Sequence, residues 1–149
     1  MKKQSVISTF WWNLDQKLSL KPVKGELGSY LLYLFLSENL FISKPRTSLL
    51  KQGYYVYCGS ARNGLLQRIN RHLRRDKRIW WHIDQITASS RAVGVLWSSK
   101  LAECELSWKL RDMELTEPVK GFGSSDCSKS CYSHFFVLET PDQFDWRLL

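Results

Sequence analysis

The sequence contains no long run of apolar residues. Its longest apolar stretch covers residues 30–36, far shorter than the roughly 20 residues that a helix needs to cross a bilayer. The amino terminus carries Lys2 and Lys3 but has neither a continuous apolar segment nor a small-residue cleavage site, so it does not resemble a secretory signal peptide. We therefore expect a cytoplasmic protein with no membrane span and no membrane partner.

Cysteine and acidic residues are also scarce. Four cysteines in a chain of 149 residues do not indicate a disulfide scaffold, and a reducing compartment keeps such residues as thiols. The 14 Asp and Glu residues are outnumbered by 22 Lys and Arg, which leaves a net charge of +8. A surplus of this size favours polyanionic partners such as nucleic acid or an acidic membrane surface.

The positive charge is concentrated in one segment. Seven basic residues and a single acid, Asp76, lie between Arg62 and Arg78. Apolar residues in this segment recur at helical spacing, and the opposite face is nearly all arginine. A run of this kind is often only a solvated helix face, but it also suits a helix that grips a phosphate backbone.

The length of the chain fits one domain with a buried core. The 44% hydrophobic and 13% aromatic content is that of a globular protein. We expect an N-terminal extension at residues 1–25, a folded domain at residues 26–140 and a C-terminal tail at residues 141–149.

Residue patterns predict a mixed α/β (α+β) fold. Short segments rich in aromatic and branched residues indicate strands, and apolar residues three or four positions apart indicate helices. These patterns place strands at residues 30–36, 40–42, 53–59, 92–97 and 133–138, and helices at residues 65–75, 80–86 and 101–113. The strand at 53–59 is expected to pair with the strand at 30–36.

Several residues have the chemistry that phosphodiester hydrolysis needs. Such a reaction requires activated water, positive charge on the phosphate and usually a divalent metal held by a carboxylate. Arg68 and His72 are four positions apart and Arg75 is seven from Arg68, so all three project from one face of the predicted helix. Tyr57 lies on a strand just before Gly59, where the backbone allows close approach of a phosphate.

In this order and spacing, the residues resemble the signature of the GIY-YIG nucleases over residues 26–138. The signature comprises Gly28-Ser29-Tyr30, Tyr57-Cys58-Gly59, Arg68, His72 and Glu105. Five segments are similar to a poorly characterised GIY-YIG subfamily: residues 53–61, 71–75, 81–84, 103–106 and 121–127. Members of that subfamily are sometimes fused to the repair glycosylase endonuclease III, which points towards DNA as the substrate and DNA-repair proteins as partners.

The resemblance implies a role for each matching residue. Tyr30 and Tyr57 would activate or orient the attacking water, Arg68 would stabilise the scissile phosphate, and His72 would assist proton transfer or contact phosphate. Glu105 would bind Mg²⁺ or Mn²⁺, with water and phosphate completing the coordination. The implied fold is a small antiparallel, roughly three-stranded sheet flanked by helices.

We expect further contacts to nucleic acid and no small-molecule organic cofactor. The expected contact residues are Ser60, Arg62, Arg71, Arg75 and His82. His82 follows Trp80 and Trp81 in the sequence. Aromatic rings such as these could stack on unpaired bases, although core packing is the simpler use for them.

Three questions stay open from the sequence. The general base could be Tyr30, Tyr57 or His72. Glu103 competes with Glu105 as the metal ligand, because both acids begin the same helix, and the position of Trp108 favours Glu105. The third question is whether the chain cuts nucleic acid or is a non-catalytic binding or repair-accessory module of the same fold.

Four residues could supply a tetrahedral zinc site: Cys104, Cys127, Cys131 and His134. Their spacing is not a strong zinc pattern, and free cysteines are commonly buried as small apolar groups. The sequence therefore favours buried thiols over structural zinc. A zinc-stabilised structural or interaction protein is the remaining alternative.

Overall fold

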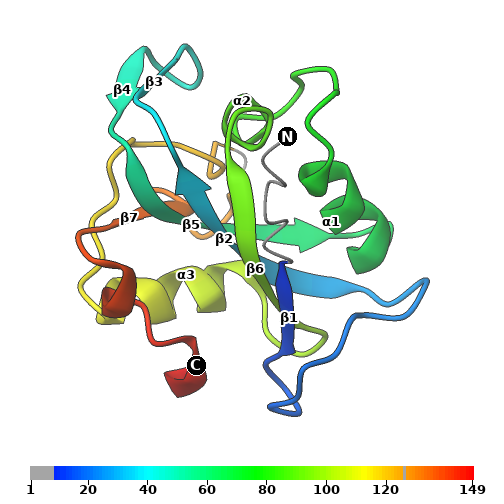
Figure 1. Cartoon of the computed structure of the whole chain (residues 1–149). Coiled ribbons are helices and arrows are strands. Elements are labelled where there is room, and N and C mark those ends of the chain that lie inside the picture. The colour runs from blue at the N-terminus through cyan, green and yellow to red at the C-terminus, as the bar shows by residue number, and fades with distance from the viewer. Residues whose placement is uncertain (1–8, 126) are drawn as a thin grey trace, which may run out of the picture.

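The computed structural model describes residues 9–125 and 127–149. The first eight residues of the expected N-terminal extension and Asp126 of the 121–127 segment therefore lie outside the described residues. A five-stranded sheet with the order β1-β6-β2-β5-β7 forms the centre of the molecule, and helices lie against it (Figure 1). The predicted α/β class is confirmed.

The elements follow one another in a mixed order. The strands are β1 (Phe10–Asn13), β2 (Gly28–Leu36), β3 (Leu40–Ile42), β4 (Ser48–Leu50), β5 (Gly53–Ala61), β6 (Arg91–Ser98) and β7 (Phe135–Leu138). The α-helices are α1 (Leu65–Leu73), α2 (Asp84–Thr87) and α3 (Glu103–Asp112), and two 3-10 turns follow at Pro141–Gln143 and Trp146–Leu148. The segment predicted as a helix at residues 80–86 is α-helical only from Asp84 onward.

The sheet is larger than the predicted three strands, and it is not purely antiparallel. Strand β2 pairs antiparallel with both β5 and β6, as expected for the central strands. Strand β7 extends the sheet beside β5, and β1 pairs parallel with β6 at the other edge. Strands β3 and β4 form a separate two-stranded ribbon.

Alternating side chains on β2 and β5 divide the core into two layers. On one face Leu32 and Tyr57 pack with Leu65 and Ile69 of α1. The other face buries side chains of β2 and β5 against α3, including Leu31, Val56, Cys58, Leu106 and Leu110. Each fully buried leucine or isoleucine contributes about 1.5–3 kcal/mol, so the two layers fix both helices on the sheet.

Both ends of the described chain belong to the same folded unit. Strand β1 lies within the segment expected to be an extension, yet it is an edge strand of the central sheet. The C-terminal segment buries Phe144 and Leu149 in the layer that contains α3. The Trp146 ring lies 4.7 Å from that of Trp12, centroid to centroid, so the expected tail is packed against β1.

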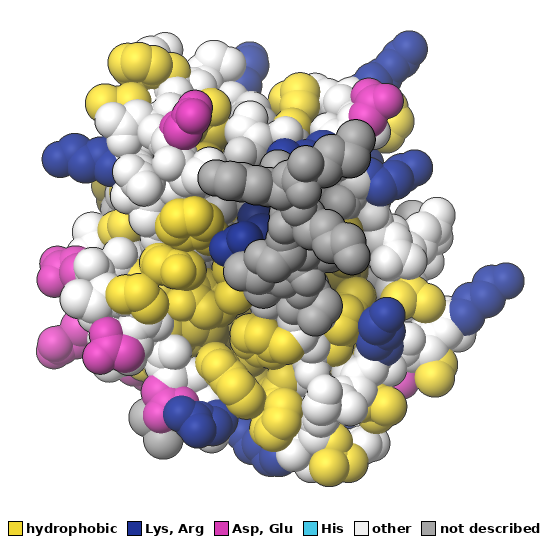
Figure 2. All heavy atoms as spheres, in the orientation of Figure 1, with side chains coloured by type: hydrophobic (Ala, Val, Ile, Leu, Met, Phe, Trp, Pro, Cys, Tyr) yellow, Lys and Arg dark blue, Asp and Glu magenta, His cyan; other side chains and the backbone are white. Residues whose placement is uncertain are grey.

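On the face seen in Figure 2, hydrophobic side chains gather near the middle, and most of the Lys and Arg side chains in view project from the edge. Among residues 9–125 and 127–149, no helix combines the length and apolar character that crossing a membrane requires.

Candidate active site

A cleft of about 1160 Å³ opens where β2 begins and β5 ends. It gathers seven of the residues that the sequence singled out, namely Tyr30, Tyr57, Ser60, Arg62, Arg68, His82 and Glu105. Helix α3 enters the same cleft at its amino-terminal end, where Glu103 and Cys104 also line the wall. The described residues His72, Arg71 and Arg75 do not line it.

The two tyrosines lie side by side beneath the cleft. Their ring centroids are 6.5 Å apart, and the side chains are 1% exposed for Tyr30 and 9% exposed for Tyr57. Burial raises the pKa of both phenols, and the nearby Glu103 charge acts in the same direction. Both tyrosines are therefore neutral at physiological pH and can donate hydrogen bonds.

Glycines allow this close arrangement. The Tyr30 ring crosses over Gly59, its register partner on β5, where an added Cβ would lie 2.4 Å from the ring. Gly123 has a positive φ of 69° and approaches the Tyr57 ring so closely that a Cβ would lie 2.9 Å from it. Any side chain at either glycine would displace a site tyrosine.

His72 lies behind Tyr30 rather than in the cleft. Its Nε2 atom is 2.6 Å from the Tyr30 hydroxyl in a buried hydrogen bond. Burial lowers the pKa of His72 to about 3, and the charges of Lys77 and Arg68 act in the same direction. The ring is therefore neutral at physiological pH and holds the Tyr30 hydroxyl in place.

This burial makes the stability of the protein pH-dependent. An unfolded histidine has a pKa of about 6.5, so below that pH the unfolded chain binds a proton that folded His72 does not. The free energy of unfolding should fall by up to about 1.4 kcal/mol per pH unit between about pH 6.5 and about pH 3. Urea unfolding of wild type and His72→Gln across this range should show a smaller decline in the variant. Parallel curves would contradict the assignment.

Arg68 is positioned as a free cation at the cleft. Its guanidinium carbon lies 4.1 Å from the centroid of the Trp81 ring, so the aromatic face holds the side chain without neutralising it. Within the described part of the chain, no carboxylate lies at ion-pair distance from Arg68. A planar, unpaired guanidinium in a cleft is suited to bind a phosphate.

Arg71, expected to contact nucleic acid, forms a buried ion pair within the fold. Its guanidinium donates two hydrogen bonds to Asp84, at 2.5 and 3.0 Å, and Asp84 is fully buried. Asp84 also accepts hydrogen bonds from the backbone N–H groups of Trp80 and Trp81. Burial raises the pKa of Asp84, but these hydrogen bonds outweigh it and hold the pKa below its usual value.

Arg75 is exposed but lines a smaller hollow beside His72, away from the cleft. The basic helix therefore presents Arg68, and not its whole arginine face, to the site. His82 does line the cleft, and its Nδ1 atom accepts a hydrogen bond from the Gly123 backbone N–H at 3.0 Å.

Three tryptophans at the cleft are exposed, and for two of them, Trp80 and Trp81, core packing was the simpler interpretation of the sequence. The exposed fractions are 66% for Trp80, 40% for Trp81 and 43% for Trp108. All three line the cleft. Core packing was expected for Trp80 and Trp81 because adjacent aromatics in a sequence give no sign of which side of the chain is covered.

The two acids at the start of α3 have different surroundings. The Glu105 side chain is exposed at the cleft, and among the described residues nothing hydrogen-bonds to its carboxylate. The Glu103 carboxylate is in ion-pair contact with Nδ1 of His134. Glu105 is thus the acid with oxygens available to an ion in the cleft.

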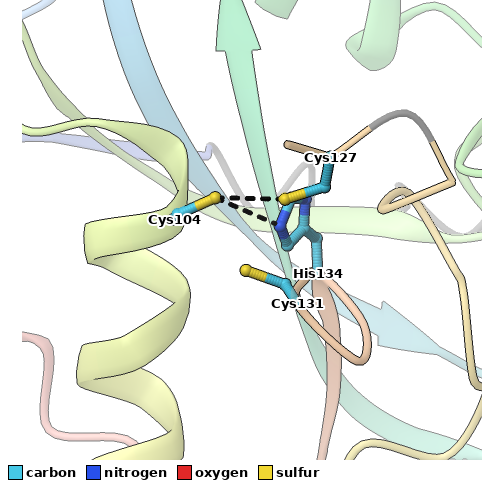
Figure 3. Close-up of side chains that lie close together, drawn as sticks. All are labelled: Cys104, Cys127, Cys131 and His134. Atoms are coloured by element: carbon cyan, nitrogen blue, oxygen red, sulfur yellow. Dashed lines mark hydrogen bonds between the residues drawn. The ribbon is translucent and has the colours of Figure 1, made fainter. Parts of the chain in front are cut away.

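A cluster of three cysteines and one histidine adjoins this cleft. The donor atoms of Cys104, Cys127, Cys131 and His134 all lie within 4.8 Å of one another and could hold a metal ion. Cys104 projects from α3 toward the loop that carries the other three residues (Figure 3). The sequence named these four residues as a possible zinc site but favoured buried thiols, because their convergence depends on packing α3 beside a loop more than 20 residues later.

Burial and the close contacts within the cluster shift the pKa values of its members. Burial raises the pKa of Cys127, but hydrogen bonds from the Cys131 backbone and from Cys104 outweigh it and bring the pKa to about 7. Burial lowers the pKa of His134, but its contacts with Glu103 and Cys131 raise it to about 9.

Comparison with known proteins gives one match. A family model described as "Domain of unknown function DUF123" matches residues 29–147. No curated protein and no solved structure matches the chain.

Proposed function

The chain belongs to the family described as Domain of unknown function DUF123, and because that description names no activity, we propose one from the cleft: metal-dependent hydrolysis of phosphodiester bonds in nucleic acid. The observation that carries the proposal is the meeting in one cleft of two neutral tyrosines, Glu105 and Arg68, and neither of these two charged residues has an ion-pair partner in the part of the chain that the structure describes. These are also the residues through which the sequence resembles the GIY-YIG nucleases, and that resemblance favours DNA as the substrate.

Arg68 binds the scissile phosphate in this proposal. Its guanidinium can donate two parallel hydrogen bonds to phosphate oxygens. The contact with the Trp81 ring positions the guanidinium before substrate arrives, so little reorganisation is needed as negative charge develops in the transition state.

Tyr57 contacts the attacking water. Of the three groups that could act on the water, Tyr57 has the largest exposed fraction, 9% against 1% for Tyr30 and 3% for His72. Its neutral phenol orients the water by hydrogen bonding. Tyr30, whose hydroxyl is held by His72, packs beside Tyr57 and keeps the Tyr57 ring in position.

The residues of the cleft fit a hard divalent ion at Glu105. Mg²⁺ and Mn²⁺ take oxygen ligands, and a protein commonly supplies only one or two carboxylates while water and phosphate fill the other positions. Glu105 offers an exposed carboxylate, whereas Glu103 is engaged by His134. When bound, the ion supplies Lewis-acid stabilisation of charge on the phosphate.

The exposed tryptophans provide a surface for nucleic-acid bases. Trp80, Trp81 and Trp108 are exposed and line the cleft, and base–aromatic stacking is worth about 1–3 kcal/mol per base regardless of sequence. Arg62 and Ser60 at the end of β5 line the same cleft and can contact the phosphate backbone.

A substrate panel tests the proposal. Labelled plasmid, branched DNA, single-stranded DNA and RNA are incubated with the purified chain, with and without Mg²⁺ or Mn²⁺, and binding is measured in parallel. We expect cleavage of at least one substrate that stops when the divalent ion is omitted. Binding without cleavage under every condition would assign the chain to the non-catalytic nucleic-acid-binding or repair-accessory class instead.

A further inference from the structure

We propose that Cys104, Cys127, Cys131 and His134 bind one structural zinc ion, and that Glu103 orients the histidine ligand from outside the coordination sphere. The proposal concerns metal content and loop position, and it stands independently of the proposed nuclease activity. Four observations carry it: the donor distances, the donor types, the Glu103 contact and the place of the cluster in the fold.

The donor distances suit a single tetrahedral ion. Zinc–sulfur bonds of about 2.3 Å place tetrahedral ligands about 3.7 Å from one another. Here Sγ of Cys104 is 3.3 Å from Sγ of Cys127 and 3.9 Å from Nε2 of His134. Since all four donor atoms lie within 4.8 Å of one another, only a small contraction around one ion is required.

The donor types select the metal. Three thiols and one imidazole form a set typical of structural zinc, with every position filled by protein. Hard ions such as Mg²⁺ prefer oxygen ligands, so this cluster does not compete with Glu105 for the ion of the proposed active site.

Glu103 occupies the position of an outer partner. His134 turns Nε2 toward the thiols and Nδ1 toward the Glu103 carboxylate. A carboxylate that accepts the second ring N–H of a histidine ligand fixes its tautomer and raises its affinity for the metal. Glu103, the competing candidate for the metal ligand in the sequence, thereby receives a role distinct from that of Glu105.

The bound ion would connect α3 to one wall of the cleft. Cys104 lies in the first turn of α3, whereas Cys127 and Cys131 lie in the loop before β7. The same loop carries Gly123, which contacts Tyr57 and donates to His82. Four protein ligands would hold this loop against the helix that also carries Glu105.

Metal analysis of the full chain tests the site. The chain is expressed with zinc in the medium and purified with its thiols kept reduced. We expect about one zinc per chain in wild type and in Cys58→Ala, a buried cysteine outside the cluster, and nearly none in Cys104→Ser and Cys131→Ser. X-ray absorption of the wild-type zinc should give three sulfur ligands and one nitrogen, a result that does not depend on any variant folding.

Wild-type protein without zinc, variants that keep their zinc, or a zinc ion without sulfur ligands would overturn the proposal. So would a Cys104–Cys127 disulfide in the same reduced preparation. A chain that holds zinc but cuts no nucleic acid would leave this site standing and remove only the proposed activity.

The two glutamates provide a matched pair for the outer contact. Glu103→Gln should bind zinc about 10–100-fold more weakly than wild type, measured by competition with a chromophoric chelator. Glu105→Gln, two positions along the same helix, should bind zinc with wild-type affinity. Equal affinities for Glu103→Gln and wild type would remove Glu103 from the site.

Discussion

Arg68→Ala is expected to slow cleavage by about 10²–10³-fold at saturating nucleic acid, because removal of one preorganised donor at the transition-state charge has effects of this size. Arg68 lines the cleft beside the Trp81 ring and has no carboxylate partner among residues 9–125 and 127–149. Binding should change much less than the cleavage rate, because the proposal assigns substrate contacts to other cationic and aromatic side chains of the cleft as well. Single-turnover rates and equilibrium binding, measured on the substrate identified by the panel, separate the two effects.

Arg75→Ala is the matched control for this prediction. Arg75 lies two turns along on the same basic segment and is exposed away from the cleft. It carries the same charge, so its replacement reports the loss of general electrostatic attraction alone. Equal losses of rate in Arg68→Ala and Arg75→Ala would show that Arg68 has no specific place at the phosphate.

Arg71→Ala is expected to destabilise the fold by about 3–5 kcal/mol, because it leaves the buried Asp84 charge without its cationic partner. The Asp84 side chain is 0% exposed and that of Arg71 is 14% exposed. The same carboxylate holds the backbone of Trp80 and Trp81, so loss of the ion pair should also loosen the aromatic wall of the cleft. Urea unfolding followed by tryptophan fluorescence measures the change.

Arg74→Ala is the stability control, because Arg74 is an exposed arginine of the same segment. This substitution should change the free energy of unfolding by less than about 0.5 kcal/mol. If Arg71→Ala and Arg74→Ala were equally stable, the Arg71–Asp84 pair would not hold the segment in place. Arg71→Ala protein that unfolds at lower urea but still binds nucleic acid when folded would match a structural role for Arg71.

The central strands were predictable because their signals are local. Residues 30–36 and 53–59 are dense in aromatic and branched side chains, and both lie within the observed β2 and β5. Strand β1 was missed because its four residues become a strand only by pairing with β6, some 80 positions later. The segment before α2 was assigned to a helix from its apolar pattern. That pattern does not reveal that the Asp84 carboxylate accepts hydrogen bonds from the backbone N–H groups of Trp80 and Trp81.

Which residues gather at the cleft was easier to predict from the sequence than which of them lie buried beneath it. Order and spacing identified Tyr30, Tyr57 and Arg68, which the fold brings to one cleft. The helical periodicity that grouped His72 with Arg68 could not place His72 under the Tyr30 hydroxyl. The position of Trp108 favoured Glu105 over Glu103, but it could not show that Glu103 contacts His134 on a distant loop.

The central claim is that a divalent ion at Glu105 supports hydrolysis in this cleft, and the most direct measurement is the single-turnover cleavage rate of wild type and Glu105→Gln at saturating Mg²⁺. The account predicts Mg²⁺-dependent cleavage by wild type, and a variant that contains the same zinc, binds the same substrate and cuts at least about 100-fold more slowly. Equal rates for the two proteins would contradict it.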